Sequence, residues 1–264
     1  MNGNDTEQAG EAARVAIVTG ASRGIGRATA LRLARDFDAL VLVARSGELL
    51  EGMAEAVRAA GSQALALDLD LREPDAAAQT VARTLAAFGR IDALLNIAGA
   101  VPQIDLLEMT DAQWDDGFAL KLNGARRLTV HAWEALKASG GSVIFTSGNS
   151  AQAPKSAFAA VATVNAAIVA LAKAFAERGV GDGVQVNSVL PGPVMTDRRR
   201  SYLEKYAHGM SVEQAIEQFP QQAGITRYGT PEDIAELFAF VLSPAGRWMV
   251  GSTLRMDGGE IKAV

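Results

Sequence analysis

The stretch from Arg14 to Gly26 most constrains what this chain can fold into. It opens with the short apolar run Val15 to Val18, which is typical of a strand buried on both faces of a parallel sheet. Gly20, Gly24 and Gly26 then permit a tight turn and a close approach of backbone N–H groups to a guest. A helical pattern follows, whose first turn offers unpaired N–H donors to an anion such as a diphosphate. Glycines also occur in strand-to-helix turns that bind nothing, so later motifs must decide.

Composition limits the remaining possibilities. The 264 residues are 49% hydrophobic, which is enough for one large α/β domain. The net charge of −5 comes from interspersed acidic and basic residues, so we expect no nucleic-acid partner and no anionic membrane surface. There is no cysteine, and His131 and His208 are isolated, so we expect no metal site.

Targeting signals are not evident in the sequence. The first twelve residues are polar and acidic, unlike a signal peptide, and we expect a flexible tail at 1–12. No apolar run approaches the roughly 20 residues of a membrane span. The sequence therefore predicts a cytoplasmic protein with one domain at 13–264.

Strand and helix patterns alternate along that domain, which predicts a doubly wound parallel sheet with helices on both faces. Thr110 opens a long helix with Gln113 completing a capping box, and this helix is expected to break or bend before Lys137. Residues 197–219 have the pattern of an inserted helical segment. The expected strands are 15–18, 39–44, 64–69, 91–97, 142–146, 184–190 and 252–256, and the other expected helices are 25–35, 48–60, 74–88, 156–177 and 230–242.

Polar and glycine-containing segments follow several of these strands, at the sheet edge where such folds bind ligands. After the third strand, Asp70 either accepts a hydrogen bond from an adenine amino group or is a solvated strand end. The fourth strand leads into Asn96-Ile-Ala-Gly99, and the sixth into Pro191-Gly-Pro-Val-Met-Thr196. Asp257-Gly-Gly259 lies near the end of the chain.

Together with Thr19-Gly20-x-x-x-Gly24-x-Gly26, these motifs resemble the short-chain dehydrogenase/reductase family from about Arg14 to Gly259, although Ile97 replaces the family's second Asn. The resemblance implies a Rossmann-type sheet of seven strands, a nicotinamide dinucleotide, and a homodimer or homotetramer assembled through two long helices. It also implies that residues 197–219 form a lid over a small-molecule substrate. The implied cofactor-binding residues are Thr19, Gly20, Ser22, Arg23, Gly24, Ile25, Gly26, Asp70, Asn96, Ala98, Gly99, Pro191, Gly192, Val194 and Thr196.

The end of the second strand indicates which dinucleotide is used. Enzymes that select NAD place a carboxylate there, on the ribose 2′-hydroxyl. This chain has Arg45 instead, and Arg45 with Arg23 provides planar donors for a 2′-phosphate. The alternative is two solvated loop arginines. We therefore expect NADP(H).

The family's catalytic residues are a serine, a tyrosine thirteen positions later, a lysine four further on, and an asparagine on the preceding helix. The corresponding positions here are Gly148, Val161, Asn165 and Lys121. No shift of a few residues restores the pattern. The family places its lysine and asparagine close together, so Lys121 and Asn165 can keep an ammonium and an amide in one pocket with their places exchanged; the alternative is a lysine that points to solvent. A buried ammonium with a lowered pKa can donate a proton.

Other candidates lie near that pocket. Ser147, Asn149 and Ser150 follow the fifth strand and can polarise a carbonyl, while Tyr202, Tyr206 and His208 belong to the inserted segment, where ordinary packing or solvation is the simpler explanation. Three functions remain open. The first is an NADP(H)-dependent oxidoreductase acting on a carbonyl or alcohol through Lys121, Asn165, Ser147 and Ser150. The second is a cofactor-binding subunit without catalysis, and the third is a non-redox isomerase or lyase.

Overall fold

The computed structural model describes residues 13–206 and 210–262; the expected tail at 1–12 lies outside this range. Its seven-stranded sheet is parallel throughout, with the order β3-β2-β1-β4-β5-β6-β7. The strand order reverses between β1 and β4, which creates a crevice at the carboxyl edge of the sheet. The expected doubly wound fold is therefore confirmed. The strands are β1 (Val15–Thr19), β2 (Ala39–Ala44), β3 (Gln63–Asp68), β4 (Ala93–Asn96), β5 (Ser142–Thr146), β6 (Gln185–Pro191) and β7 (Thr253–Met256).

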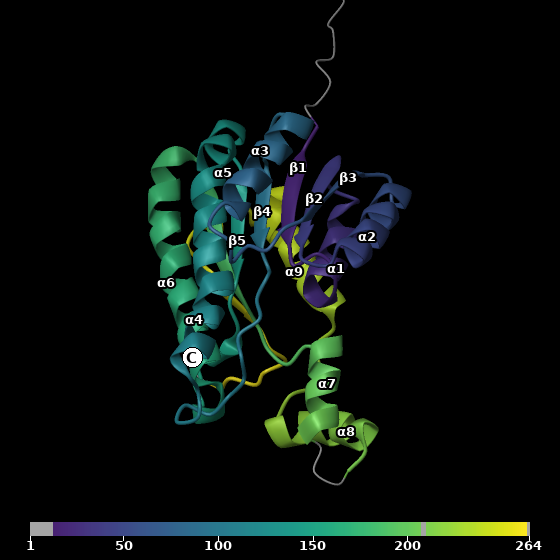
Figure 1. The fold of residues 1–264 in the computed structure, drawn as a ribbon, viewed down its shortest axis with the longest axis vertical. Coiled ribbons are helices and arrows are strands. Elements are labelled where there is room, and N and C mark those ends of the chain that lie inside the picture. The colour runs from purple at the N-terminus through teal and green to yellow at the C-terminus, as the bar shows by residue number, and fades with distance from the viewer. Residues whose placement is uncertain (1–12, 207–209, 263–264) are drawn as a thin grey trace, which may run out of the picture.

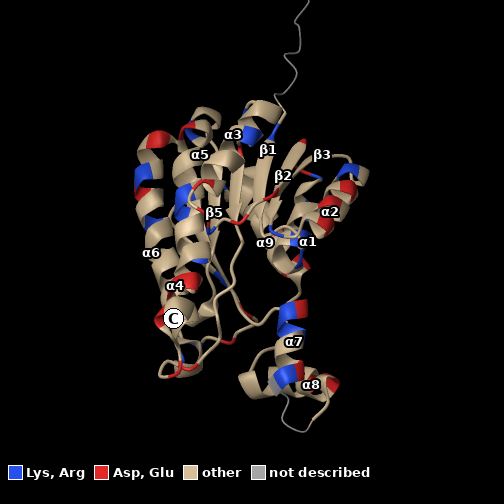
Figure 2. Ribbon diagram, in the orientation of Figure 1, with Lys and Arg blue, Asp and Glu red and all other residues tan. Residues whose placement is uncertain are grey.

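Helices cover both faces of the sheet (Figure 1). One face packs against α3 (Ala76–Phe88), α5 (Ala125–Ser139) and α6 (Ala159–Asp182), and the other against α1 (Gly24–Leu33), α2 (Gly47–Ala59) and α9 (Pro231–Leu242). Alternate residues of β1 point to opposite faces, so Val15 and Ile17 join the first core and Ala16 and Val18 the second. This explains why the strand is apolar at its first four positions, Val15 to Val18. Figure 2 shows acidic and basic residues interspersed over the helices.

The long helix expected from Thr110 to Lys137 has an irregular middle. It begins as α4 (Asp111–Phe118), where Thr110 and Gln113 form the expected capping box. The π-helical segment η1 (Ala119–Gly124) follows and leads directly into α5. Widened turns of this kind are rare in proteins, and those that occur often lie at functional sites. The expected bend is thus a π segment, and Lys121 lies within it.

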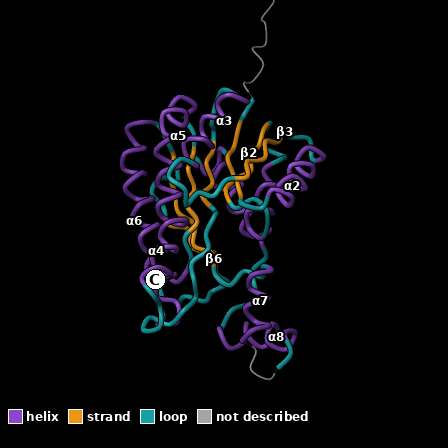
Figure 3. The backbone as a smooth tube through the Cα atoms, in the orientation of Figure 1, coloured by secondary structure: helices purple, strands orange, loops and turns teal. Residues whose placement is uncertain are grey.

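The helical segment expected at 197–219 contains two helices, α7 (Asp197–Tyr206) and α8 (Val212–Ala223). The second helix ends beyond the expected limit at Phe219. The Ser211 hydroxyl accepts from the Gln214 N–H to start α8, and Gly224, with a φ of 64°, ends it. Both helices extend from the carboxyl edge of the sheet, where the loops gather (Figures 1 and 3). His208 lies outside the described residues, as does the side chain of Tyr206.

Helix α6, preceded by the short η3 (Ser156–Phe158), corrects one expectation. Residues 156–182 contain an 18-residue window with a mean hydropathy of 1.8, so by length and composition this helix is able to cross a membrane. The expectation that the chain contains no run of that kind is therefore wrong. In the structure, Ala160, Val164, Ile168 and Ala172 recur every four residues and belong to the core beneath the sheet. Helices in the core of a globular protein can have the same length and hydropathy as a membrane-spanning helix.

Candidate functional site

The glycine turn after β1 is shaped by the absence of side chains. Gly20 and Gly24 have φ values of 67° and 53°, in the left-handed region that favours glycine. A Cβ at position 26 would lie 2.1 Å from the Gly20 carbonyl oxygen, so α1 can start against the turn only with glycine there. Ser22 and Arg23 lie in the turn, and Ile25 packs on the core. The turn forms a cradle lined by backbone.

The exit of β4 is bonded to this turn. The Thr19 hydroxyl donates to the Leu95 carbonyl at 3.1 Å and accepts from the backbone N–H groups of Ile97 and Ala98, at 2.8 and 3.0 Å. A Cβ on Gly20 would approach the Ala98 Cα to 3.1 Å. The structure therefore places the Thr19-Gly20 motif and the Asn96 to Gly99 motif side by side.

Asn96 itself is buried at the end of β4. Its amide donates to the Thr129 hydroxyl of α5 at 3.1 Å, while its Oδ1 has no hydrogen-bond partner among the described residues. This side chain ties the strand to the helix behind it.

The exit of β6 completes the crevice. A Cβ on Gly192 would lie 2.5 Å from the Asp257 Cα, so the Pro191-Gly192 and Asp257-Gly-Gly259 motifs meet through closely packed backbone. Val194 forms an isolated parallel bridge with Gly229. The Thr196 hydroxyl accepts from the Arg199 N–H at 3.2 Å and its methyl group faces Gly24, 3.4 Å from the position of a Cβ there. The first turn of α7 thus lies beside the glycine turn.

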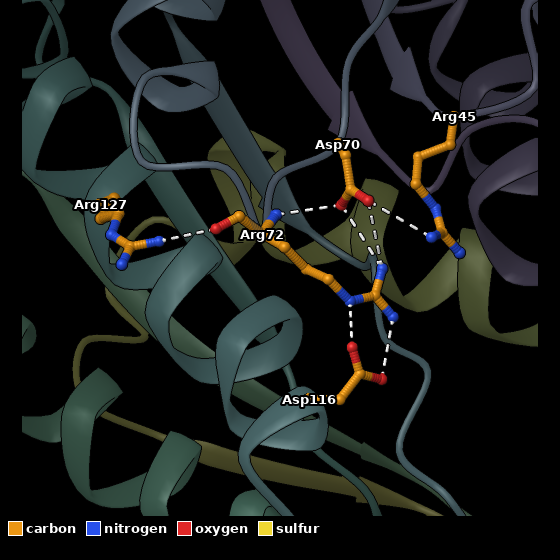
Figure 4. A network of polar contacts seen from close by, with 5 residues as sticks. All are labelled: Arg45, Asp70, Arg72, Asp116 and Arg127. Atoms are coloured by element: carbon orange, nitrogen blue, oxygen red, sulfur yellow. Dashed lines mark hydrogen bonds and ion pairs between the residues drawn. The ribbon is translucent and has the colours of Figure 1, made fainter. Parts of the chain in front are cut away.

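Arg45 at the end of β2 belongs to a chain of charged groups (Figure 4). Its Nη1 lies 3.3 Å from the Asp70 carboxylate, and Arg72 contacts Asp70 at 3.4 Å and Asp116 of α4 at 2.6 Å. Arg127 of α5 donates to the Arg72 carbonyl. Burial opposes ionisation of Asp70, but the Arg72 N–H and the charges of Arg72 and Arg45 outweigh it and lower the Asp70 pKa.

This network involves Asp70 and Arg45, the two residues expected at the adenosine end of a dinucleotide. Asp70 is neither free nor simply solvated, because it already accepts from two arginines. Arg45 lies beside Asp70, and its side chain remains 54% exposed. An exposed guanidinium at a strand end is accessible to a phosphate.

Lys121 projects from the π segment into the crevice. Its Nζ donates to the Asn165 Oδ1 at 2.5 Å and to the Ser147 carbonyl at 3.0 Å. Its aliphatic chain passes over Gly99, where a Cβ would lie 3.0 Å from the Lys121 Cδ. The lysine therefore turns inward over a position without a side chain.

Asn165 of α6 joins the four residues expected to be catalytic into one cluster. It is 3% exposed, and its amide nitrogen donates to the Ser150 hydroxyl at 2.8 Å. The Ser147 hydroxyl donates to the Asn165 carbonyl at 2.7 Å, so Ser147 offers the crevice only its own carbonyl, which Lys121 occupies. A Cβ on Gly148 would lie 2.7 Å from the Asn165 amide nitrogen. The space beside Gly148 thus holds the Asn165 amide.

The charge state of Lys121 is set by its surroundings. Burial of the ammonium and the positive charge of Arg198 lower its pKa from the ordinary value to about 7. Near neutral pH the group therefore exists in both protonation states, as general acid–base chemistry requires.

Two features of the site were not anticipated from the sequence. Arg198 donates to the Val101 carbonyl at 2.8 Å and to the Gly99 carbonyl at 3.4 Å. Arg199 lies over the rings of Tyr202, Phe219 and Tyr228, at 5.3, 4.8 and 5.7 Å from their centroids. Three successive arginines after Thr196 are the signal that could have indicated both. Tyr202 also packs against Phe158, with ring centroids 6.3 Å apart.

Around the same crevice, Asn149 donates to the carboxylate of Glu260. Burial raises the pKa of Glu260, although Lys155 and Asn149 oppose that shift. Within the described part of the chain, no three His, Asp or Glu side chains are grouped to hold a metal ion.

A parallel doubly wound sheet with a glycine turn at its switch point defines the Rossmann class of α/β proteins. A family model described as enoyl-(acyl carrier protein) reductase matches residues 20–260. The short-chain reductase NovJ of Streptomyces niveus is 32% identical over 255 residues, covering 97% of both proteins. An uncharacterised oxidoreductase of Mycobacterium tuberculosis is 33% identical over 248 residues, covering 93% of this chain and 91% of that protein.

Solved structures agree with these relatives. The crystal structure of L-sorbose reductase from Gluconobacter frateurii, complexed with NADPH and L-sorbose, has a TM-score of 0.90 and 28% identity, covering 96% of this chain and 98% of that one. The chain therefore belongs to the short-chain dehydrogenase/reductase family. It is an oxidoreductase of that type.

Proposed function

We propose that this protein is an NADPH-dependent reductase of small carbonyl compounds in which Lys121 donates the proton. One observation carries the proposal: the Lys121 ammonium is held in the crevice by the Asn165 Oδ1 and the Ser147 carbonyl. A lysine pointing to solvent, the alternative left open by the sequence, has neither contact.

The residues at the crevice fit a nicotinamide dinucleotide. The glycine turn has no side chain that would occupy a diphosphate site, and the N-terminus of α1 faces it. Thr19, Gly20, Ser22, Arg23, Gly24, Ile25 and Gly26 would bind the diphosphate side, Asp70 and Arg45 the adenosine side, and Asn96, Ala98, Gly99, Pro191, Gly192, Val194 and Thr196 the nicotinamide side. The complex of L-sorbose reductase with NADPH supports this assignment. The exposed Arg45 favours a 2′-phosphate and so NADPH over NADH.

The proposed active site departs from the family pattern at all four positions. Gly148, Val161 and Asn165 replace the serine, tyrosine and lysine, and Lys121 replaces the asparagine. The contact between Gly148 and the Asn165 amide supports a joint change, because a serine at 148 would clash with Asn165 as it now lies. Lys121 and Asn165 then keep an ammonium and an amide together with their positions exchanged.

The chemistry follows from this cluster. When bound, the reduced nicotinamide supplies a hydride to the carbonyl carbon. Lys121 Nζ gives a proton to the carbonyl oxygen, so that C=O becomes CH–OH and a neutral amine remains, which solvent protonates again. The Ser150 hydroxyl accepts from Asn165, which leaves its own hydrogen free to donate to the substrate oxygen. Asn165 thereby orients both Lys121 and Ser150.

A binding and activity experiment tests the proposal. NADPH fluorescence measures binding, and a screen of ketones and aldehydes on the same sample measures turnover. Lys121→Ala should lower kcat by about 100-fold or more, the usual contribution of a general acid. Lys173→Ala is the matched control, because this lysine also donates to a backbone carbonyl, that of Gly251, but lies outside the crevice. Binding without turnover of any carbonyl would identify a cofactor-binding subunit instead.

We further propose a homodimer or homotetramer built on α4–α5 and α6. Thr163, Ala166 and Ala170 form an exposed stripe of small residues along α6, and Val130 of α5 is 52% exposed. Sedimentation at micromolar concentration should give a multiple of 27.6 kDa. A mass of one chain would contradict the assembly.

A further inference from the structure

Arg198 is a cation held by backbone carbonyls. It lies in the first turn of α7, and its hydrogen bonds are to two neutral acceptors, the carbonyls of Gly99 and Val101. Within 13–206 and 210–262, no carboxylate forms an ion pair with it. Arg200, two residues later, pairs with Glu213 at 3.5 Å. Figure 2 shows the basic residues along α7.

The neighbours of Arg198 are also cationic. Burial and then the charge of Arg23 lower the Arg198 pKa, and Arg198 in turn lowers the pKa of Lys121. Positive charge therefore runs from the glycine turn, through Arg198, to Lys121. These like charges repel one another, and a bound anion would relieve the repulsion.

The backbone around Arg198 locates that anion. Thr196 packs against Gly24, so α7 and α1 begin at the same place, beside the glycine turn. Gly99, which accepts from Arg198, is also the residue over which the Lys121 side chain passes. The guanidinium thus lies between the glycine turn and Lys121. An anion bound between the two helix starts is within its range.

We propose that Arg198 binds the diphosphate of the dinucleotide and gives up its contacts with Gly99 and Val101 to do so. This inference rests on the proposed function, because it assumes that a dinucleotide binds. A guanidinium forms two parallel hydrogen bonds with a phosphate, which are stronger than bonds to neutral carbonyls.

Binding constants for three ligands distinguish diphosphate binding by Arg198 from 2′-phosphate binding by Arg45. Arg198→Ala should weaken NADPH and NADH by the same factor, roughly 10- to 100-fold, because both contain the diphosphate. Adenosine 2′-monophosphate has no phosphate at its 5′ position and should bind within about twofold of the parent value. Arg45→Ala should show the opposite pattern, weakening NADPH and the monophosphate but not NADH. Arg200→Ala is the matched control on the same helix and should change none of them.

The contrary results distinguish failure of the Arg198 inference from failure of the proposed function. If the parent protein binds NADPH and Arg198→Ala binds it equally well, the inference is overturned and the proposed function stands. An unchanged NADPH constant with a raised KM for carboxylate-bearing substrates would assign Arg198 to a substrate anion instead. If the parent binds neither dinucleotide, the proposed function and this inference both fail. Circular dichroism verifies that each variant is folded, and Arg198→Lys, which keeps the charge, should recover part of the binding.

Discussion

The glycine turn and the Lys121 cluster lie in the same crevice but are built in opposite ways. The turn is specified by side chains that are absent: Gly20 and Gly26 leave space that backbone fills, and Gly24 takes a positive φ beside the Thr196 side chain. The Lys121 cluster is specified by side chains from three separate elements, namely η1, the exit of β5 and α6. A local loop therefore shapes the first, whereas tertiary packing assembles the second.

The two regions should respond differently to substitution. At Gly20 and Gly26, a single added methyl group meets backbone, which cannot move away. In the cluster, Asn165 shares its polar groups with Lys121 and Ser150, so removing one member changes the hydrogen bonding of the others. Variants of the turn should disturb binding, and variants of the cluster should disturb turnover.

The largest effect is expected from Gly26→Ala. Its Cβ would lie 2.1 Å from the Gly20 carbonyl oxygen, so the turn and α1 must separate. NADPH affinity should fall by more than about 100-fold, because the diphosphate site and the helix start are displaced together. Fluorescence titration measures the loss. Gly52→Ala in α2 is the control, since a Cβ there meets nothing within 4 Å, and NADPH binding at parental strength by the Gly26 variant would refute the role given to the turn.

Lys121→Met should separate the two regions most clearly. The thioether keeps much of the side-chain volume but has no proton to give, so kcat should fall by about 100-fold or more while NADPH affinity changes less than about threefold. In the parent protein, carbonyl reduction should decline as pH rises above about 7, where the ammonium is lost. Steady-state kinetics across pH 6 to 9 measure both effects. Full activity in the methionine variant would remove Lys121 from the mechanism.

Arg45→Asp should act on binding alone and change the choice of cofactor. A carboxylate at the end of β2 repels a 2′-phosphate and accepts from a ribose hydroxyl. The ratio of NADPH to NADH affinity should fall by roughly tenfold or more. Arg83→Asp on α3, an exposed position of the same charge, controls for the change in net charge. Equal affinities for the two cofactors in the parent would contradict the assignment of Arg45.

The smallest effect concerns the pH dependence of stability. The pKa of Lys121 is about 7 in the folded protein and about 10.4 in an unfolded chain, so between these values the unfolded state binds more protons. Stability contributed by this group therefore rises with pH from about 7 to 10, and below pH 7 its burial is fully unfavourable.

Lys121→Met, which has no such group, should be more stable than the parent at pH 6. That advantage should shrink by about 1 kcal/mol or more by pH 9, because the parent loses its buried ammonium above pH 7. Urea unfolding at both pH values measures the difference. An advantage that grows with pH would show that Lys121 is not held with a lowered pKa.

The sequence predicted the fold well because its signals are local. The strand at 15–18, the glycine spacing and the capping box at Thr110 each act over a few residues, and the structure has all three. The segment that follows Thr196 was harder to predict, since it contains two helices, α7 and α8, and the second ends beyond the expected limit of 219. The hydropathy of α6 was misjudged because small alanines dilute its apolar appearance while its buried face remains regular.

The sequence by itself also predicted that Lys121 and Asn165 stand where the family has other residues, but not that they touch. Their 2.5 Å contact spans 44 positions and depends on the π segment, which turns Lys121 over Gly99, and on Gly148, which leaves room for the Asn165 amide. The same is true of Arg198, whose contacts with Gly99 and Val101 join the start of α7 to the exit of β4. Backbone conformation follows from neighbouring residues, whereas the pairing of distant side chains is decided only when the helices pack on the sheet.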